Sequence, residues 1–227
     1  MNLNTDLSQR VVIDTTQLEW SPSPLPGVER RRLEREATES GRATSIVRYA
    51  PGASFSSHVH DGGEEIYVME GSLSDESGTF PAGSYLRNPP GSSHAPNSEG
   101  GCLLFVKLCQ MSASEGASQL VVDTRNGEWI DRGEGKPRSM PLFSANGGEA
   151  GQSPTERVSL VRFAPGDRVE NDLHDGGEEV LVLEGVLEDE YGRYPEGTWL
   201  RQPDGSSHTP FSTEGCLLFV KRGHLSL

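Results

Sequence analysis

Short apolar runs separated by turn residues recur along the whole chain. The runs SIVRYAP (45–51), EIYVMEG (65–71), GSYLRNP (83–89) and CLLFVK (102–107) are rich in β-branched and aromatic residues, and the first three end at glycine or proline. This composition favours strands. Turn signals return roughly every 8–12 residues, which is the spacing of an all-β sandwich or barrel. The pattern therefore predicts an all-β protein built from short strands.

The same series of runs occurs twice. Residues 45–107 align without a gap with residues 159–221 at an offset of 114, and 37 of the 63 aligned positions are identical. The longest shared strings are HDGGEE, GSSH and GCLLFVK. Self-similarity of this kind indicates two homologous units. We therefore predict two tandem domains, 1–112 and 113–227, with the small polar segment SASEGAS (112–118) as the linker.

One segment of each copy has a different pattern. The charge spacing of ERRRLEREATES (29–40) resembles that of a helix, whereas its counterpart DRGEGKPRSMPLFSANGG (131–148) contains two prolines and several glycines. Proline and glycine disfavour the interior of a helix. Because homologous copies should share one structure, we predict a strand or a loop for both segments.

The charge of the chain limits its partners. Twenty basic against 34 acidic residues give a formal charge of −14, which repels nucleic-acid phosphates and anionic membranes. No run reaches the roughly 18 apolar residues of a membrane span, and the start MNLNTDLSQRVVIDT lacks the features of a secretion signal. We expect a soluble, cytoplasmic protein that binds neither nucleic acid nor membrane.

The cysteines do not form a recognisable framework. There are three of them, without a CxxC motif, which argues against a set of disulfides and against a zinc finger. Cys102 and Cys216 lie in the identical string GCLLFVK. We predict that both are buried apolar side chains rather than reactive thiols.

Five of the six histidines fall at repeated positions, and those of the first copy suggest a metal site. His58 and His60 are two residues apart, so a strand would turn both to one face. A turn separates them from Glu64, and a Pro-Pro-Gly turn precedes His94. Three imidazoles and one carboxylate suit zinc, iron, manganese, nickel or copper, and the ligand set alone does not choose among these metals. The alternative is a satisfied polar cluster.

The second copy carries a changed version of this group. Asp172 stands opposite His58, whereas His174, Glu178 and His208 are kept. Two carboxylates would shift the preference toward manganese, iron or harder cations. The sequence leaves two interpretations open, a second metal site of these four residues and a vestigial site kept as a structural half.

The motifs of the first copy resemble those of the cupin superfamily. Gly52-x5-His58-x-His60-x3-Glu64-x6-Gly71 fits the first cupin motif, and Gly83-x5-Pro89-x-Gly91-x2-His94 fits the second, apart from Ser98 where that motif ends in asparagine. The resemblance extends through both repeats. It implies a bicupin, that is, two tandem jelly-roll-type barrels of the double-stranded β-helix kind.

A narrower resemblance is to the ChrR-like cupin domain. Copy two carries its pattern almost intact in HDGGEEVLVLEGVLEDEYGRYPEGTWLRQPDGSSHTPFSTEGCLLFVK. The resemblance implies a zinc ion on His58, His60, Glu64 and His94. In ChrR-type anti-sigma factors the sigma-binding part is a separate helical domain with a His-x3-Cys-x2-Cys motif. Residues 1–44 contain no such motif, so the resemblance gives no support for sigma-factor binding.

Two functions from different classes follow from the resemblance. The first is a regulatory, sensory or stress-response metal-binding protein, with zinc as the expected metal and a small molecule as a ligand at the metal. The alternative is a dioxygenase that uses iron, copper or nickel to act on a small diketone or enediol. Cupins often pair through sheet edges, so a homodimer is expected by analogy.

Overall fold

The computed structural model describes residues 2–37, 41–111, 118–145 and 156–225. The regular elements of these residues are strands, apart from two short 3₁₀ helices at Thr15–Gln17 and Thr124–Asn126. The prediction of an all-β chain is therefore confirmed. Within the described part of the chain, no helix is long and apolar enough to cross a membrane.

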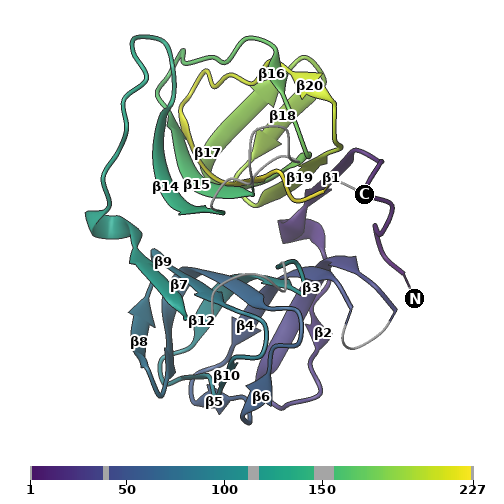
Figure 1. Ribbon diagram of the computed structural model, residues 1–227, viewed down its shortest axis with the longest axis vertical. Helices are drawn as coiled ribbons and strands as arrows, with labels where there is room; N and C mark the ends of the chain where they lie inside the picture. The colour runs from purple at the N-terminus through teal and green to yellow at the C-terminus, as the bar shows by residue number, and fades with distance from the viewer. Residues whose placement is uncertain (1, 38–40, 112–117, 146–155, 226–227) are drawn as a thin grey trace. The chain divides into compact units, whose positions relative to one another are not determined.

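The chain forms two compact units, and each unit contains the first strand of the other sequence repeat (Figure 1). One unit consists of residues 1–5 and 18–126, and the other of residues 6–17 and 127–227. The predicted boundary between residues 112 and 113 therefore does not separate the structural units, because each unit takes its residues from both repeats. We call the units the first and the second barrel. The proposed linker lies, apart from residue 118, outside the described residues.

The first barrel is built from antiparallel strands. Its large sheet has the order β13-β9-β7-β12-β4-β3-β2; β8 and β11 pair with the far part of β7, β11 also pairs with β5, and β6 pairs with β10. The strands are β2 (Ser21–Pro22), β3 (Val28–Arg35), β4 (Ala43–Tyr49), β5 (Ala53–Ser54), β6 (His58–Val59), β7 (Glu64–Asp75), β8 (Gly78–Pro81), β9 (Ser84–Asn88), β10 (Ser93–His94), β11 (Asn97–Ser98), β12 (Cys102–Leu108) and β13 (Leu120–Asp123).

The second barrel repeats this arrangement. Its large sheet has the order β1-β19-β17-β21-β15-β14, β18 pairs with β17, and β16 pairs with β20. The strands are β1 (Val11–Asp14), β14 (Arg138–Ser144), β15 (Arg157–Phe163), β16 (Asp172–Leu173), β17 (Glu178–Asp189), β18 (Gly192–Pro195), β19 (Thr198–Gln202), β20 (Ser207–His208) and β21 (Cys216–Arg222).

Most of the predicted strands are confirmed. β4, β9 and β12 match three of the apolar runs, and β3 and β14 occupy the two segments for which a strand or loop was predicted. The predicted end of the strand at 65–71 was wrong, because β7 continues through Gly71 to Asp75. A β-bulge opposite Leu103 and Leu104 bends this strand, so its second half leaves the large sheet and pairs with β8.

Each exchanged strand is anchored by a threonine. In the second barrel β1 pairs with β19, and the Thr15 hydroxyl donates a hydrogen bond to the carbonyl of Gly197 at 2.7 Å. In the first barrel β13 pairs with β9, and the Thr124 hydroxyl donates to the carbonyl of Gly83 at 2.6 Å. Both threonines are buried. Each anchor therefore holds a strand of one repeat in the barrel formed mainly by the other repeat.

Removing these hydroxyls should destabilise the barrel that receives the strand. Thr15→Val is expected to lower the stability of the second barrel by about 1 kcal/mol, the usual net value of one buried hydrogen bond. Hydrogen exchange should show the loss of protection at 198–202. Thr124→Val is the matched control and should loosen 84–88 instead. Loosening of the repeat that carries the mutated threonine would contradict the exchange of strands.

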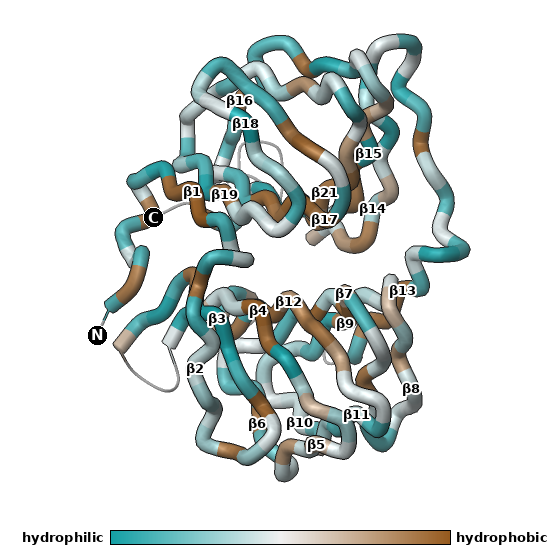
Figure 2. The backbone as a smooth tube through the Cα atoms, turned by 180° about the vertical axis from the view of Figure 1, so that it is seen from behind, coloured by the Kyte–Doolittle hydropathy of each residue, from teal (hydrophilic) through white to brown (hydrophobic). Residues whose placement is uncertain are grey.

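The apolar core lies inside each barrel. Figure 2 shows apolar stretches along β12 and along β17 and β21. In the first barrel Val47, Ile66, Val68, Leu86 and Leu104 belong to one buried cluster, and the second barrel has an equivalent cluster. Cys102 and Cys216 are buried, free cysteines, which confirms the prediction of an apolar role.

Candidate metal centre

The four predicted ligands of the first copy come together in the first barrel. His58 lies on β6 directly opposite His94 on β10, and Glu64 opens β7. His60 lies between β6 and β7, where its backbone amide donates to the carbonyl of Ser92 at 2.9 Å. One candidate ligand atom from each of the four side chains lies within 4.8 Å of the others. Residues 36 positions apart therefore share one site.

The orientation of the imidazoles suits a metal ion. Nδ1 of His58 is 2.9 Å from the carbonyl oxygen of Ser56, and a carbonyl only accepts, so Nδ1 carries a proton and Nε2 is the nitrogen that can bind a cation. Nε2 of His60 is buried without a hydrogen-bond partner among the described residues, and Nε2 of His94 is buried 3.3 Å from Glu64 Oε2. Buried polar atoms are nearly always satisfied. The residues present thus fit a bound cation.

The charges of Glu64 and His60 also fit, whereas for His94 the effect of burial is outweighed by Glu64 and Asp75, which raise its pKa above the ordinary value. Burial alone would raise the pKa of Glu64, but His94, His60 and the amide of Asn88 bring it below its ordinary value. Burial lowers the pKa of His60 below its ordinary value, although Glu64 opposes this shift. An ionised carboxylate and a neutral imidazole are the forms that bind metals.

Two residues that the sequence analysis did not single out hold the ligands in place. Asp75, on the far part of β7, accepts a hydrogen bond from Nδ1 of His94 at 3.0 Å, and its side chain is fully buried. Asn88 on β9 donates to Glu64 Oε2 at 2.9 Å. The signal for Asp75 was its recurrence as Asp189 in the shared pattern DE-x-G.

Asp75→Asn should weaken metal binding without removing a ligand. The asparagine can no longer hold the imidazole of His94 through a charge-assisted bond, and changes of this kind cost about 10–100-fold in metal affinity. Competition with a chromogenic chelator measures the loss. Asp189→Asn is the matched change in the second barrel. An affinity unchanged by Asp75→Asn would contradict the role assigned to Asp75.

The second group also comes together, but with a different partner. Candidate ligand atoms of Asp172, His174, Glu178 and His208 lie within 4.8 Å of one another. Nε2 of His174 is 3.4 Å from Glu178 and 3.9 Å from Asp172. The guanidinium of Arg222 forms ion pairs with Asp172 and with Glu178. The sequence analysis missed Arg222, which lies one position beyond the identical block GCLLFVK.

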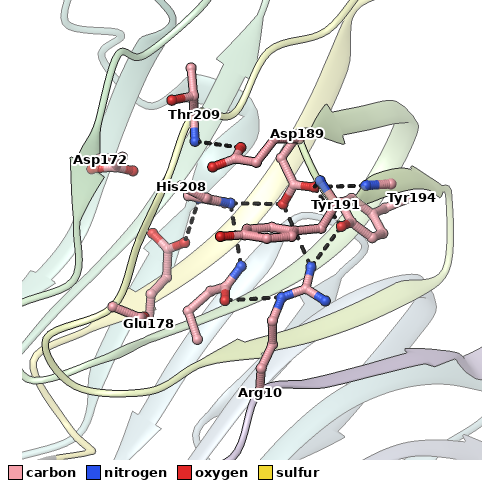
Figure 3. A network of polar contacts seen from close by, with 12 residues as sticks. Arg10, Asp172, Glu178, Asp189, Tyr191, Tyr194, His208 and Thr209 are labelled. Carbon is pink, nitrogen blue, oxygen red and sulfur yellow. Dashed lines mark hydrogen bonds and ion pairs between the residues drawn. The ribbon is translucent and has the colours of Figure 1, made fainter.

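A polar network holds the imidazole of His208 through its Nδ1 atom (Figure 3). Nδ1 of His208 donates to Asp189 at 2.9 Å, and the hydroxyl of Tyr194 donates to the same carboxylate at 2.6 Å. Arg10 donates to the hydroxyl of Tyr194 at 2.6 Å and to the amide oxygen of Gln202 at 3.2 Å. Burial, followed by Asp189, raises the pKa of Tyr194 to about 12.

The exchanged segments thus contribute to both sites. Arg10 precedes β1, and its counterpart at an offset of 109 is Gln119, which precedes β13. Gln119 donates to Asn88 at 2.8 Å, and Asn88 in turn holds Glu64. Each ligand group is therefore supported by a residue from the other repeat. Sequence motifs gave no signal for these contacts, which join residues 31 and 192 positions apart.

The first ligand group lies in the wall of a cavity. The cavity has a volume of about 380 Å³, and His58, His60, Glu64 and His94 line it together with Arg30 and Phe55. Much of the rest of the wall is apolar, and Arg35, Ser45 and Asp61 are polar members of it; the apolar side chains include those of Val47, Tyr49, Ile66, Leu73, Leu104, Val106 and Leu108. The second barrel has a cavity of about 310 Å³ lined by Asp172, Glu178, His208 and Arg222 among others. The volumes suit small organic molecules.

The comparisons with known proteins agree with this geometry. The family model of the ChrR cupin-like domain matches residues 8–112 and 117–226. No curated protein gives a significant match. The structure is similar to those of cupin-fold proteins, which confirms the prediction of two tandem cupin barrels.

Three similar structures show the range of the fold. A candidate dioxygenase from Nostoc punctiforme is 16% identical, with a TM-score of 0.75 over 97% of this chain and 85% of that chain. The Escherichia coli pirin in complex with nickel(II) is 10% identical, with a TM-score of 0.69 over 94% and 98%. The Bacillus subtilis oxalate decarboxylase with Mn(II) centres is 12% identical, with a TM-score of 0.65 over 95% and 78%. At these identities the likeness concerns the fold.

Proposed function

Because the chain belongs to the ChrR cupin-like domain family over both repeats, we propose that it is a metal-binding bicupin with a sensory or regulatory role, whose first barrel holds one divalent ion and binds a small molecule beside it. The proposed ligands are His58, His60, Glu64 and His94. Zinc is the proposed metal, since three imidazoles and one carboxylate suit it. The ion would supply Lewis acidity and a coordination position for a ligand.

The observation that carries the proposal is the opening of the ligand group into the cavity. Structural zinc sites are closed by four protein ligands and packed protein, whereas sites that bind further molecules keep access to the metal. Here His60, Glu64 and His94 are buried, but His58 is half-buried and all four line the cavity of about 380 Å³. A small molecule in the cavity would lie against the ion.

The cavity wall favours a particular class of ligand. Its apolar side chains would contact an apolar body, and Arg30, whose guanidinium carbon is 5.9 Å from the ring centre of Phe55, would attract a negative charge. We propose a small organic anion with an apolar body, which includes the enolate of a diketone. In the second barrel, serine stands at the position equivalent to Arg30, at an offset of 109.

Metal content tests the proposal. The full chain, purified without an affinity tag or chelating column, is analysed by elemental mass spectrometry, and bound zinc that His60→Ala removes is the expected result. His224→Ala is the control, because His224 belongs to neither ligand group. A chain that carries no metal and binds none on titration would overturn the proposal.

A dioxygenase is the second candidate, and the same cavity favours it. A bound ion with an accessible face could meet both dioxygen and a chelating anion, and the Nostoc punctiforme protein of similar fold is described as a candidate dioxygenase. The iron(II)-loaded chain would then consume oxygen with a β-diketone or flavonol, and His60→Ala would abolish this uptake. Tight zinc binding without uptake for any such substrate favours the sensory role.

A further inference from the structure

Two differences between the ligand groups occur as a pair. At an offset of 114, His58 of the first copy corresponds to Asp172, and Leu108 corresponds to Arg222. One change adds a negative charge to the group, and the other adds a positive charge. From this pair and its contacts, we propose that the guanidinium of Arg222 takes the place of the divalent ion in the second barrel, which therefore holds no metal.

The strand register explains how the arginine reaches the site. In the first barrel Leu108 on β12 lies directly opposite Glu64 on β7, and in the second barrel Arg222 on β21 lies directly opposite Glu178 on β17. Side chains at opposed positions of an antiparallel pair are neighbours on one face of the sheet. A charged side chain at position 222 is therefore placed beside the carboxylate of the group.

The contacts occupy both carboxylates. Nη1 of Arg222 donates to Asp172 Oδ1 at 3.0 Å, and Nη2 donates to Asp172 Oδ2, which gives the two-pronged geometry typical of arginine and a carboxylate. The same Nη2 forms an ion pair with Glu178. One nitrogen thus lies between the two acidic members of the ligand group. Both oxygens of Asp172 face the guanidinium.

The first barrel differs in the counter-charge beside its carboxylate, while buried Nε2 atoms without a hydrogen-bond partner among the described residues occur in both barrels, on His60 in the first and on His174 and His208 in the second. Leu108 carries no charge and packs against the apolar cluster. Around Glu64 lie the amide of Asn88 and the imidazoles of His60 and His94, with no arginine among these contacts. A buried carboxylate is stabilised by a positive charge beside it. In the first barrel an external ion would supply it, whereas in the second barrel the chain supplies it.

A divalent ion would bind poorly beside Arg222. It would have to displace the guanidinium from Asp172 and then remain close to a fixed positive charge in a partly buried site, where repulsion is stronger than in water. We expect zinc to bind to the second group at least about 100-fold more weakly than to the same group without the arginine.

Zinc titration of the full chain tests the proposal. The titration is made in a His60→Ala background, so that the first group does not contribute. This background is expected to bind no zinc in the micromolar range. Addition of R222L and D172H together restores the residues of the first copy and is expected to create one site. D172H alone keeps the arginine and is the control, expected to create none. R222Q, which removes the charge but keeps a polar side chain, serves if R222L does not fold, as judged by circular dichroism.

The outcomes separate this proposal from the proposed function. A tight zinc site in the His60→Ala background, lost on His174→Ala, would overturn the proposal about Arg222 and leave the first site intact. Failure of the folded D172H/R222L and D172H/R222Q variants to gain a site would also overturn it, because the arginine would not be what excludes the ion. If the unmodified chain binds no zinc, that result contradicts the proposed metal site of the first barrel and does not bear on the proposal about Arg222.

Discussion

His60→Ala is expected to abolish the metal binding that we propose for the first barrel. His60 contributes one of four proposed ligands, and its ring lies 4.7 Å from that of His94 between ring centres. Loss of a direct ligand should exceed the 10–100-fold effect of an outer contact, so the dissociation constant should rise by more than about 100-fold. Elemental mass spectrometry of the purified chain and chelator competition measure this change.

The equivalent variant in the second barrel is the matched control. His174→Ala removes the corresponding imidazole, which lies beside Glu178 and Asp172. Because Arg222 balances those carboxylates, the metal content should stay unchanged. An undiminished metal content in His60→Ala would place the ion elsewhere in the molecule.

Gly71→Ala is expected to cause the largest loss of stability. Gly71 has a φ of 69°, and an added Cβ would lie 2.1 Å from the carbonyl oxygen of Gly101 and 3.0 Å from Cα of Cys102. These are backbone atoms, so relief requires a shift of β7 against β12 beside the bulge. The strained φ costs about 1–2 kcal/mol and overpacking about 1–3 kcal/mol. The first barrel should lose about 2–5 kcal/mol.

Gly52→Ala separates the two causes. Gly52 also has a positive φ, 77°, but an added Cβ would have no neighbour within 4 Å. It should cost only the strain of about 1–2 kcal/mol. Native-state hydrogen exchange of the amides in β7 and β12 measures both variants without assuming that two barrels unfold as one. Equal effects of the two substitutions would contradict the close approach at Gly71.

Gly71 and Gly185 show what the sequence motifs predicted and what they left unexplained. The glycine closing the first cupin motif was evident from the sequence, but its reason was not. The reason is the approach of Gly101 and, in the second barrel, of Gly215, where the added Cβ would also lie 2.1 Å from a carbonyl oxygen. These partners are 30 residues away, and only the pairing of β7 with β12 and of β17 with β21 brings them close.

The ligand groups were predictable because the two motifs contain all their members, although only the pairing of β6 with β10 brings His94 opposite His58. His58 and His60 share a short segment with Glu64, and a turn of known type precedes His94, so the motif fixes which residues meet. The supporting contacts of Asp75, Asn88 and Gln119 depend on which strands pair, and no short pattern encodes them. The two sites differ at two residues, and the sequence motif indicated only one of them, because Asp172 lies in the motif and Arg222 lies outside it.

The sequence by itself determined the duplication, the strand composition and the two sets of four candidate ligands, because repeated strings, alternation and turns act over a few residues. Only the tertiary structure decided that β1 and β13 belong to the barrel of the other repeat, that Arg10 and Gln119 support the sites, and that Arg222 faces Asp172 and Glu178. Strand pairing depends on free energies summed over contacts between distant segments, which a local pattern does not contain.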